Sequence, residues 1–475
     1  MLNALKDKTK DISGPDLNIK QYCDLFVATL LEEFHIRTLD DTRQILIQEG
    51  YTCVFEDRPI IIRLKELILN APTGNYKMYK TNVLECIKDS TLFSRKDFTT
   101  AGNLINFNNG YYDTNTDTFH KITEIIEVNE NEKEKVFFYK IPHDYLEGEY
   151  NCPEFKKALG QWLEPNDKSL GQKRLVNDDD IFEGIGLCMG TETGLKKEFI
   201  SYGKKDSAKT QLLNCINHII GADNITSFTL HDILHSRFTT GFLQLKIFNG
   251  CGEISEGVIK KTSVFKQLTG DDSLVPAELK HGSCFNFKSF VKFWFNLNKF
   301  PKLFNVDDDA FFERFVLVEF PNVFSNERDD YKLEFWKEML TKDEIQGIIH
   351  ESIKGIKRLR ERKGFREEII LNTKDKWLRK ADSMYNFIKT YCEERKEYKE
   401  LCEDVQEAYY NTSSTYLEHR SITTELQKFG ITKRRLRKDG KLEYFYIGLK
   451  IKNRSNIIEE KKTEWQKDPL LQEVD

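Results

Sequence analysis

The chain has 475 residues, of which 39% are hydrophobic, 12% aromatic and 31% charged, and its formal net charge is −5 at pH 7. This length exceeds what a single hydrophobic core supports, so we expect about three domains, each apolar enough to fold. The acidic balance excludes a uniformly basic surface, so any contact with nucleic acid has to come from local basic patches.

The ten cysteines occur singly, with no Cys-x-x-Cys pair and no close histidine at metal-ligand spacing. This pattern argues against a structural zinc site or a disulfide framework, and it fits a reducing compartment. The N-terminus has no signal-type apolar run, and no segment approaches the ~20 apolar residues needed to span a bilayer. We therefore expect a soluble, cytoplasmic protein with no membrane partner.

Residues 1–150 are expected to form an N-terminal domain of mainly helical α+β type. Apolar residues recur at helical spacing in 25–34 and 60–69, as they do on one face of an amphipathic helix. Around 105–113 the pattern changes to short strands and tight turns.

Residues 151–195 form the predicted helical connection to a core at 196–330. Within the core, apolar-rich runs at 243–248, 291–295 and 315–320 are candidate strands. Long segments separate these runs, which favours a buried and largely parallel sheet.

After the core, the chain is charged and helical at 331–375, which we interpret as a lid or linker. Residues 376–452 combine three predicted helices with a hairpin that turns at 439–440, an Asp-Gly pair that is a strong two-residue turn signal. We interpret this combination as a winged-helix DNA-binding domain. Residues 453–475 are polar without apolar periodicity and are expected to be a tail.

A phosphate-binding loop is indicated at residues 203–210, between the β-prone run 198–202 and the helical pattern of 211–220. Backbone N–H groups of such a loop and the positive end of the following helix cradle phosphates. Lys209 would reach the β- and γ-phosphates of ATP, and Thr210 would hold Mg²⁺. The loop residues expected to bind the nucleotide are Gly203, Lys204, Lys205, Asp206, Ser207, Ala208, Lys209 and Thr210.

Ala208 departs from the loop pattern, which has glycine at this position. If the backbone there must adopt positive φ, the added Cβ costs roughly 1–2 kcal/mol. We expect either weaker nucleotide binding or a slightly reshaped loop.

Three further residues are candidates for ATP hydrolysis. Glu253 follows the first candidate strand by a short bend and would order the metal-bound water or act as general base; the alternatives are an ordinary surface carboxylate or Glu256 in its place. Asn298 follows the second strand and would contact the γ-phosphate or water, although alone it is more typical of a turn. Arg314 precedes the third strand and would serve the neighbouring subunit as an arginine finger.

The order of these motifs resembles superfamily 3 DNA helicases, in the branch joined to primases in satellite phages, poxviruses and archaeal plasmids. The most specific segments are 265–272, Phe-Lys-Gln-Leu-Thr-Gly-Asp-Asp, and 277–280, Ala-Glu-Leu-Lys. In that family such a stretch leads into a β-hairpin whose tip carries a basic residue into a central channel. The upstream stretches 107–110 and 141–145 look like the domain that precedes the helicase core. The resemblance assigns DNA contact to Lys266, Lys280 and His281.

The resemblance implies an AAA+-like α/β P-loop NTPase core that uses ATP and Mg²⁺. It also implies a homo-oligomeric ring, expected to be a hexamer, with the N-terminal domain as collar. The partners would be single-stranded and forked DNA, and a primase or polymerase domain in cis or in trans. Three departures, Ala208, Asp271 and Glu313, would lower ATPase activity without changing the fold.

A second basic patch follows the predicted helix at 422–429. On a wing, these side chains would grip duplex or forked DNA through its phosphates; the alternative is a solvated charged face. The patch comprises Lys433, Arg434, Arg435, Arg437, Lys438 and Lys441.

The leading hypothesis is therefore an ATP-dependent replicative DNA helicase of a virus or plasmid, translocating 3′ to 5′ by resemblance. An ATP-switched origin-binding or loading factor is the alternative, because a degenerate loop can bind nucleotide and turn it over poorly. A small-molecule phosphotransferase is weaker, since it would leave both basic regions without a purpose.

Overall fold

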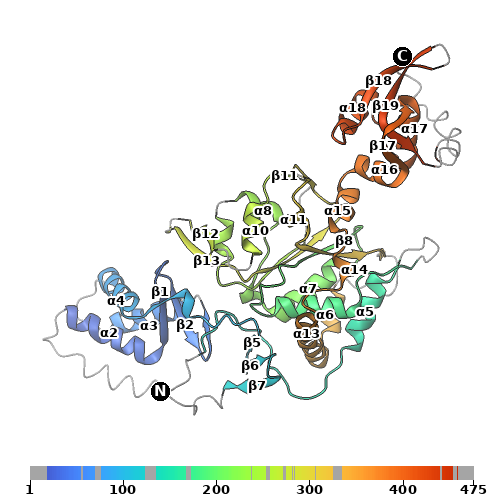
Figure 1. Cartoon of the computed structure of the whole chain (residues 1–475). Helices are drawn as coiled ribbons and strands as arrows, with labels where there is room; N and C mark the ends of the chain where they lie inside the picture. The colour runs from blue at the N-terminus through green and yellow to red at the C-terminus, as the bar shows by residue number, and fades with distance from the viewer. Residues whose placement is uncertain are drawn as a thin grey trace. The chain divides into compact units, whose positions relative to one another are not determined.

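The structure is a computed structural model of the chain, and it divides into two compact units, each described here by itself (Figure 1). The first unit comprises Met1–Ser255, Ile259–Asn298 and Glu313–Leu371, and the second Glu256–Val258, Lys299–Phe312 and Asn372–Asp475. The residues that the structure describes are 19–54, 57–69, 76–122, 135–166, 173–236, 238–252, 257–270, 274–280, 282, 284–304, 306–324, 334–438, 441–452 and 457.

The first unit begins with three helices and a four-stranded sheet. The helices are α2 (Ile19–Glu33), α3 (Arg58–Leu69) and α4 (Tyr76–Ser90), and the strands are β1 (His35–Leu39), β2 (Ile45–Glu49), β3 (Thr52–Val54) and β4 (Leu92–Phe93), in the order β3-β2-β1-β4. The helical patterns at 25–34 and 60–69 are confirmed for α2 and α3. The sheet was not predicted, because its strands have only two to five residues and such short apolar runs carry little periodicity.

A three-stranded antiparallel meander follows, in agreement with the strands and turns predicted around 105–113. The 3₁₀ turn η1 (Arg95–Asp97) comes first in the chain. The meander itself consists of β5 (Leu104–Phe107), β6 (Gly110–Asp113) and β7 (Thr118–Lys121). Gly110 has a φ of 156°, and a Cβ there would lie 2.1 Å from the carbonyl oxygen of His120. Only glycine fits this turn.

The main sheet has five strands that all pair in parallel. The strands β8 (Glu198–Gly203), β9 (Ile225–Thr226), β10 (Phe248–Cys251), β14 (Lys292–Leu297) and β16 (Phe315–Phe320) lie in the order β16-β8-β14-β10-β9. Strands β14 and β16 agree with the predicted runs at 291–295 and 315–320.

The strand predicted at 243–248 is wrong in its bounds, because β10 begins only at Phe248. Residues 243–245 form a turn in which Leu245 has a φ of 54°. The strand itself contains Asn249, a polar residue that hides the apolar pattern. Asn249 is tolerated inside the sheet since its amide bonds Thr226 Oγ1 at 2.9 Å and the backbone of Phe228 at 2.8 and 3.0 Å.

Helices and shorter elements complete the first unit. The helical stretch predicted at 151–195 contains two helices, α5 (Pro153–Leu163) and α6 (Asp178–Cys188). The other helices are α7 (Lys209–Ile220), η4 (Ala222–Asn224), α8 (Leu230–His235), α9 (Thr239–Phe242), α10 (Ser263–Leu268), α12 (Phe335–Met339), α13 (Lys342–Arg362) and α14 (Glu367–Ile370). The strands β12 (Leu274–Glu278) and β13 (Cys284–Lys288) form a hairpin. In strand β11 (Val258–Ile259), Val258 belongs to the second unit and Ile259 to the first.

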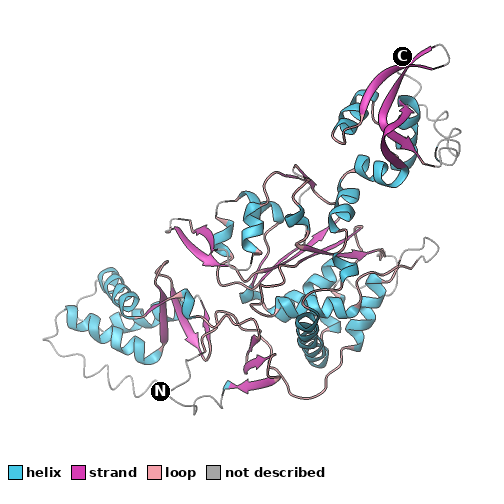
Figure 2. Cartoon of the chain, in the orientation of Figure 1, coloured by secondary structure: helices cyan, strands magenta, loops and turns pink. Residues whose placement is uncertain are grey.

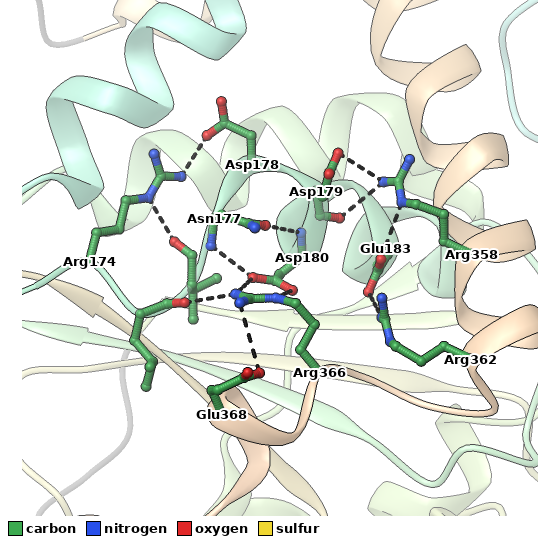
Figure 3. A network of polar contacts seen from close by, with 12 residues as sticks. Arg174, Asn177, Asp178, Asp179, Asp180, Glu183, Arg358, Arg362, Arg366 and Glu368 are labelled. Atoms are coloured by element: carbon green, nitrogen blue, oxygen red, sulfur yellow. Dashed lines mark hydrogen bonds and ion pairs between the residues drawn. The ribbon is translucent and has the colours of Figure 1, made fainter.

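Ion pairs join α6 to α13 and to the start of α14 (Figure 3). The side chain of Glu183 on α6, 1% exposed, lies 3.3 Å from Arg358 and 2.5 Å from Arg362 on α13. Arg366 reaches Asp180 at 2.5 Å. Buried carboxylates of this kind need their partners, because an unpaired charge in the interior is strongly destabilising.

The second unit contains a three-stranded antiparallel sheet with helices beside it (Figure 2). Its elements are β15 (Lys302–Leu303), α11 (Asp309–Phe312), α15 (Thr373–Ala381), α16 (Ser383–Tyr391), β17 (Cys392–Leu401), α17 (Cys402–Ser413), α18 (His419–Gln427), β18 (Thr432–Lys438) and β19 (Lys441–Ile451). The hairpin turn at 439–440 and, apart from Ile457, the predicted tail at 453–475 lie outside the described residues. In the described ranges, no helix combines the length and apolarity needed to cross a membrane.

Candidate nucleotide-binding site and basic surfaces

The predicted phosphate-binding loop connects β8 to α7 at the carboxyl edge of the main sheet. Strand β8 ends at Gly203, where a Cβ would lie 2.3 Å from the carbonyl oxygen of Phe320 at the end of β16. The Phe324 N–H donates to the Asp206 carbonyl at 2.8 Å. The end of β16 therefore packs against the loop on one side and anchors its middle.

The backbone at Ala208 is left-handed, with φ 70° and ψ 7°. Ala208 therefore has the positive φ that the loop pattern made a possibility, and its Cβ costs roughly 1–2 kcal/mol in this conformation. Asp206 is also left-handed, with a φ of 59°. Two non-glycine residues in this conformation within one short loop indicate local backbone strain, which is typical of ligand-binding segments.

Lys209, the first residue of α7, is 7% exposed and folds back over the loop. Its Nζ donates to Gly203 O at 2.9 Å, to Lys204 O at 2.7 Å and to Ser207 Oγ at 3.0 Å. The ammonium group therefore lies among oxygen acceptors inside the loop. Phosphate oxygens could replace these acceptors, so the residues fit a nucleotide phosphate.

The other polar residues of the loop face solvent. Lys204, Lys205, Asp206 and Thr210 are exposed, and Thr210 lies in the first turn of α7, where the helix dipole favours anions. Ser207 is buried beneath the lysine. The loop therefore presents four polar side chains to solvent beside the start of α7.

Asn298 lies at the same edge as the loop. In the pairing of β14 with β8, Leu297 lies opposite Tyr202, so Asn298, one residue further, comes level with Gly203. Asn298 is exposed. Asn298 is therefore level with the start of the loop, while Glu253 and Glu256 lie outside the described residues.

The strand order makes this edge a switch point. Strand β8 lies between β14 and β16, and the chain runs from β8 out to β9 and returns through β10 and β14 before it crosses to β16. Open α/β sheets bind ligands at such a point, outside the carboxyl ends of the strands.

Arg314 lies at the opposite edge of the sheet. Phe315 pairs with Glu198 and Phe320 with Gly203, and five steps of roughly 3.3 Å give about 17 Å between the two edges. The Arg314 Nη1 donates to Thr269 O at 2.9 Å. The structure therefore does not bring Arg314 to the loop of its own chain.

Asn296 on β14 is a polar residue that the sequence analysis missed. It is 1% exposed, and neither amide atom has a hydrogen-bond partner among the described residues. Buried amides are rarely left unpaired. An asparagine within the apolar run Phe293–Leu297 is the signal that could have singled it out.

The segment predicted to reach DNA contains the β12–β13 hairpin, in which Leu274 pairs with Lys288 and Glu278 with Cys284. Lys280 lies exposed in the connection between the strands, and His281 lies outside the described residues. Lys266 is half-buried on α10.

The second basic patch lies on the hairpin of the second unit, mainly on β18. Its members on β18 are Lys433, half-buried, and Arg434, Arg435, Arg437 and Lys438, all exposed, while Lys441 begins β19 and is also exposed. The sequence analysis missed Tyr444, which is 50% exposed. Its ring centroid lies 4.8 Å from the Lys433 ammonium and 5.5 Å from the Arg435 guanidinium. A ring between two cations suits base stacking as well as phosphate contact.

The described residues contain no group of three or more His, Cys, Asp and Glu side chains arranged to hold a metal ion. Of the two predicted Mg²⁺ ligands, Thr210 is exposed at the start of α7 and Glu253 is not described. A magnesium ion at this site would be reached by Thr210, whose hydroxyl is an oxygen ligand of the kind that Mg²⁺ takes.

Two family models match parts of the chain. Residues 201–314 match a family of unknown function, DUF5906, and this range contains the loop, Asn298 and Arg314. Residues 69–164 match a family described as D5 N terminal like. Neither match spans half of the chain. The second match supports the broad class that the sequence predicts, a viral replication protein of the primase-helicase type.

No curated protein matches the chain. Among solved structures, it is similar to the A form apo structure of the NrS-1 C-terminal region, with a TM-score of 0.42 and 13% identity over 89% of this chain and 98% of that one. It is also similar to the apo structure of the NrS-1 C-terminal region (305–718), with a TM-score of 0.41 and 14% identity over 90% and 98% of the two chains.

Proposed function

We propose that the chain is an ATP-dependent replicative DNA helicase that forms a homo-oligomeric ring, a hexamer, and moves 3′ to 5′ on single-stranded DNA during replication of a virus or plasmid. The observation that carries the proposal is the loop between β8 and α7, in which Lys209 is held 2.7 to 3.0 Å from three oxygen acceptors. In this proposal the main sheet is a P-loop NTPase core of AAA+ type, and α16, α17, α18 and the β18–β19 hairpin form a winged helix.

On binding ATP, Lys209 would exchange its hydrogen-bond acceptors within the loop for phosphate oxygens. The Lys209 ammonium would leave the carbonyl oxygens of Gly203 and Lys204 for the β- and γ-phosphates, and backbone N–H groups at the start of α7 would donate to the same phosphates. Mg²⁺ would neutralise phosphate charge when bound. Asn298, level with the start of the loop, would orient the attacking water or the γ-phosphate.

Arg314 would act on the nucleotide of a neighbouring copy, because about 17 Å of paired strand separates it from its own loop. Its bond to Thr269 O also attaches it to the segment that leads into the β12–β13 hairpin. A change at the subunit interface could thus move the hairpin that carries Lys280. This contact supports a coupling between hydrolysis and movement along DNA.

The test is ATP hydrolysis by the full chain with and without single-stranded DNA, beside a Lys209→Ala control. DNA-stimulated turnover that the control abolishes is expected. Mixing Lys209→Ala chains with Arg314→Ala chains should restore part of the activity, since one interface would then hold an intact loop and an intact arginine. Turnover that is absent in the wild type, or insensitive to Lys209→Ala, refutes the proposal.

The left-handed conformation of Ala208 favours a second candidate function, that of an ATP-switched origin-binding or loading factor. Strain at Ala208 would weaken the placement of the phosphates without removing them. Nucleotide binding without turnover, combined with strong affinity for a particular duplex sequence, would decide for this candidate.

A further inference from the structure

A cavity of about 460 Å³ lies within the first unit, away from the phosphate-binding loop. Its walls come from segments that are distant in sequence: Asp40 and Asp41, residues 94–100 around η1, Phe138, the turn at 243–246, and the β12–β13 hairpin with the residues that follow it. The hairpin is the same one that carries Lys280 in its connection. A volume of this size accommodates a ligand such as a nucleotide.

Aromatic rings form part of the cavity wall. Phe98 and Phe138 meet edge to face with centroids 5.7 Å apart, and Phe290 packs on Phe138 at 5.6 Å. Phe287 of β13 also lines the cavity. Apolar ring surfaces in a cavity offer the faces on which nucleic-acid bases stack.

Basic groups line the cavity as well, and the Lys288 ammonium lies 5.7 Å from the centroid of the Phe290 ring. The Arg95 guanidinium is fixed by Asp41 at 2.6 Å and by Gln244 at 2.6 Å, and it lies 4.9 Å above the ring of Phe285. Lys96 is exposed and Lys288 half-buried, and both line the cavity. Asp40 and Lys246 line the cavity as well. Because the Asp41 carboxylate is paired with Arg95, three lysines face one remaining carboxylate, and the balance of charge favours a phosphate.

The turn at 243–246 adds a second and independent observation. Leu245 lines the cavity with a φ of 54°, a left-handed conformation that is unfavourable for a leucine. Strained residues of this kind gather at ligand-binding segments. The fold retains the strain at a position where it shapes the cavity wall.

We propose that this cavity binds a nucleotide unit, an aromatic base with its phosphate, of the single DNA strand that the β12–β13 hairpin contacts. The base would stack against Phe290, which is half-buried, whereas Phe287 is only 3% exposed. The phosphate would lie between Lys96 and Lys288. This inference rests on the proposed helicase function. A strand is favoured over a free nucleotide because β13 lines the cavity and leads directly from the connection that holds Lys280.

The test uses a fluorescent 20-residue oligothymidylate that contains 4-thiothymidine, bound to the full chain without ATP. Lys96→Gln combined with Lys288→Gln should weaken binding at least tenfold and reduce the salt slope by about 0.7, the value for one lost phosphate contact on a single strand. Lys65→Gln, an exposed lysine on α3, is the matched control and should change neither value. Irradiation should attach the oligonucleotide to peptides that contain Phe287 or Phe290.

Two outcomes overturn the inference. One is unchanged affinity of the double variant together with cross-links that avoid the cavity. The other is loss of the cross-link when free thymidine monophosphate is added at millimolar concentration, which would make a free nucleotide the ligand. Because ATP is absent, the result is independent of hydrolysis: a chain that cross-links here but shows no ATPase would refute the helicase function alone.

Discussion

Replacing Ala208 by glycine tests the strained loop directly. The left-handed φ of 70° costs an alanine roughly 1–2 kcal/mol, and glycine removes this cost. Glycine also makes the unfolded chain more flexible, which offsets about 0.4–1 kcal/mol of the gain in stability. Ala208→Gly should therefore stabilise the first unit by about 1 kcal/mol. It should also tighten ATP binding, because a relaxed loop can adjust to the phosphates.

The assay is urea unfolding followed by tryptophan fluorescence, with ATP affinity measured on the same preparations. Ala222→Gly is the matched control, because Ala222 is exposed in η4 and is not among the residues with positive φ. The same chemical change there should destabilise the protein by about 0.4–1 kcal/mol. If both variants lose stability equally, the backbone at Ala208 is not strained and the reasoning is refuted.

Three further predictions concern the elements around the loop. Gly203→Ala places a Cβ 2.3 Å from Phe320 O, so urea unfolding should show a loss of about 1–3 kcal/mol; unchanged stability would contradict the packing. Burial raises the pKa of Glu198 to about 7. As the pH rises from 4.5 to 7, the folded carboxyl therefore keeps a proton that the unfolded chain has released, and the free energy of unfolding falls. Relative to the wild type, Glu198→Gln should gain up to about 3 kcal/mol between pH 5 and pH 8, and a constant difference across that range would count against a raised pKa. Arg366→Ala leaves the Asp180 carboxylate, 1% exposed, without its arginine and should cost about 3 kcal/mol in the same unfolding assay, of which Arg366→Lys should recover part.

Strands with uninterrupted apolar sequence could be predicted well. The run at 315–320 agrees with β16 because both faces of this strand are covered, so nearly every residue is apolar. Strand β10 was missed in part because Asn249 and Gly250 interrupt the apolar pattern. The hydrogen bonds that make Asn249 acceptable come from Thr226 and Phe228, more than twenty residues away, and no local pattern contains them.

The loop could be located from sequence because its residues are contiguous. The cavity could not, since Arg95, Gln244 and Phe285 meet only through the fold. Tyr444 was overlooked for a similar reason: its cationic neighbours Lys433 and Arg435 lie on the facing strand. Sites built from facing or distant segments need the register of the strands, which a single sequence leaves open.

Departures from ordinary packing rules gather at both ends of the central strands. At the carboxyl edge lie the left-handed Ala208 and, nearby on β14, the unpaired amide of Asn296. At the amino edge lies the buried carboxyl of Glu198, of which one oxygen accepts from Phe293 N at 2.6 Å and the other has no hydrogen-bond partner among the described residues. The apolar middle of β8, β14 and β16 can hold such unfavourable groups in place, because its pairing and packing are independent of them. A sheet built in this way keeps its shape independently of the groups at its edges, which the proposed nucleotide-driven cycle would require of its core.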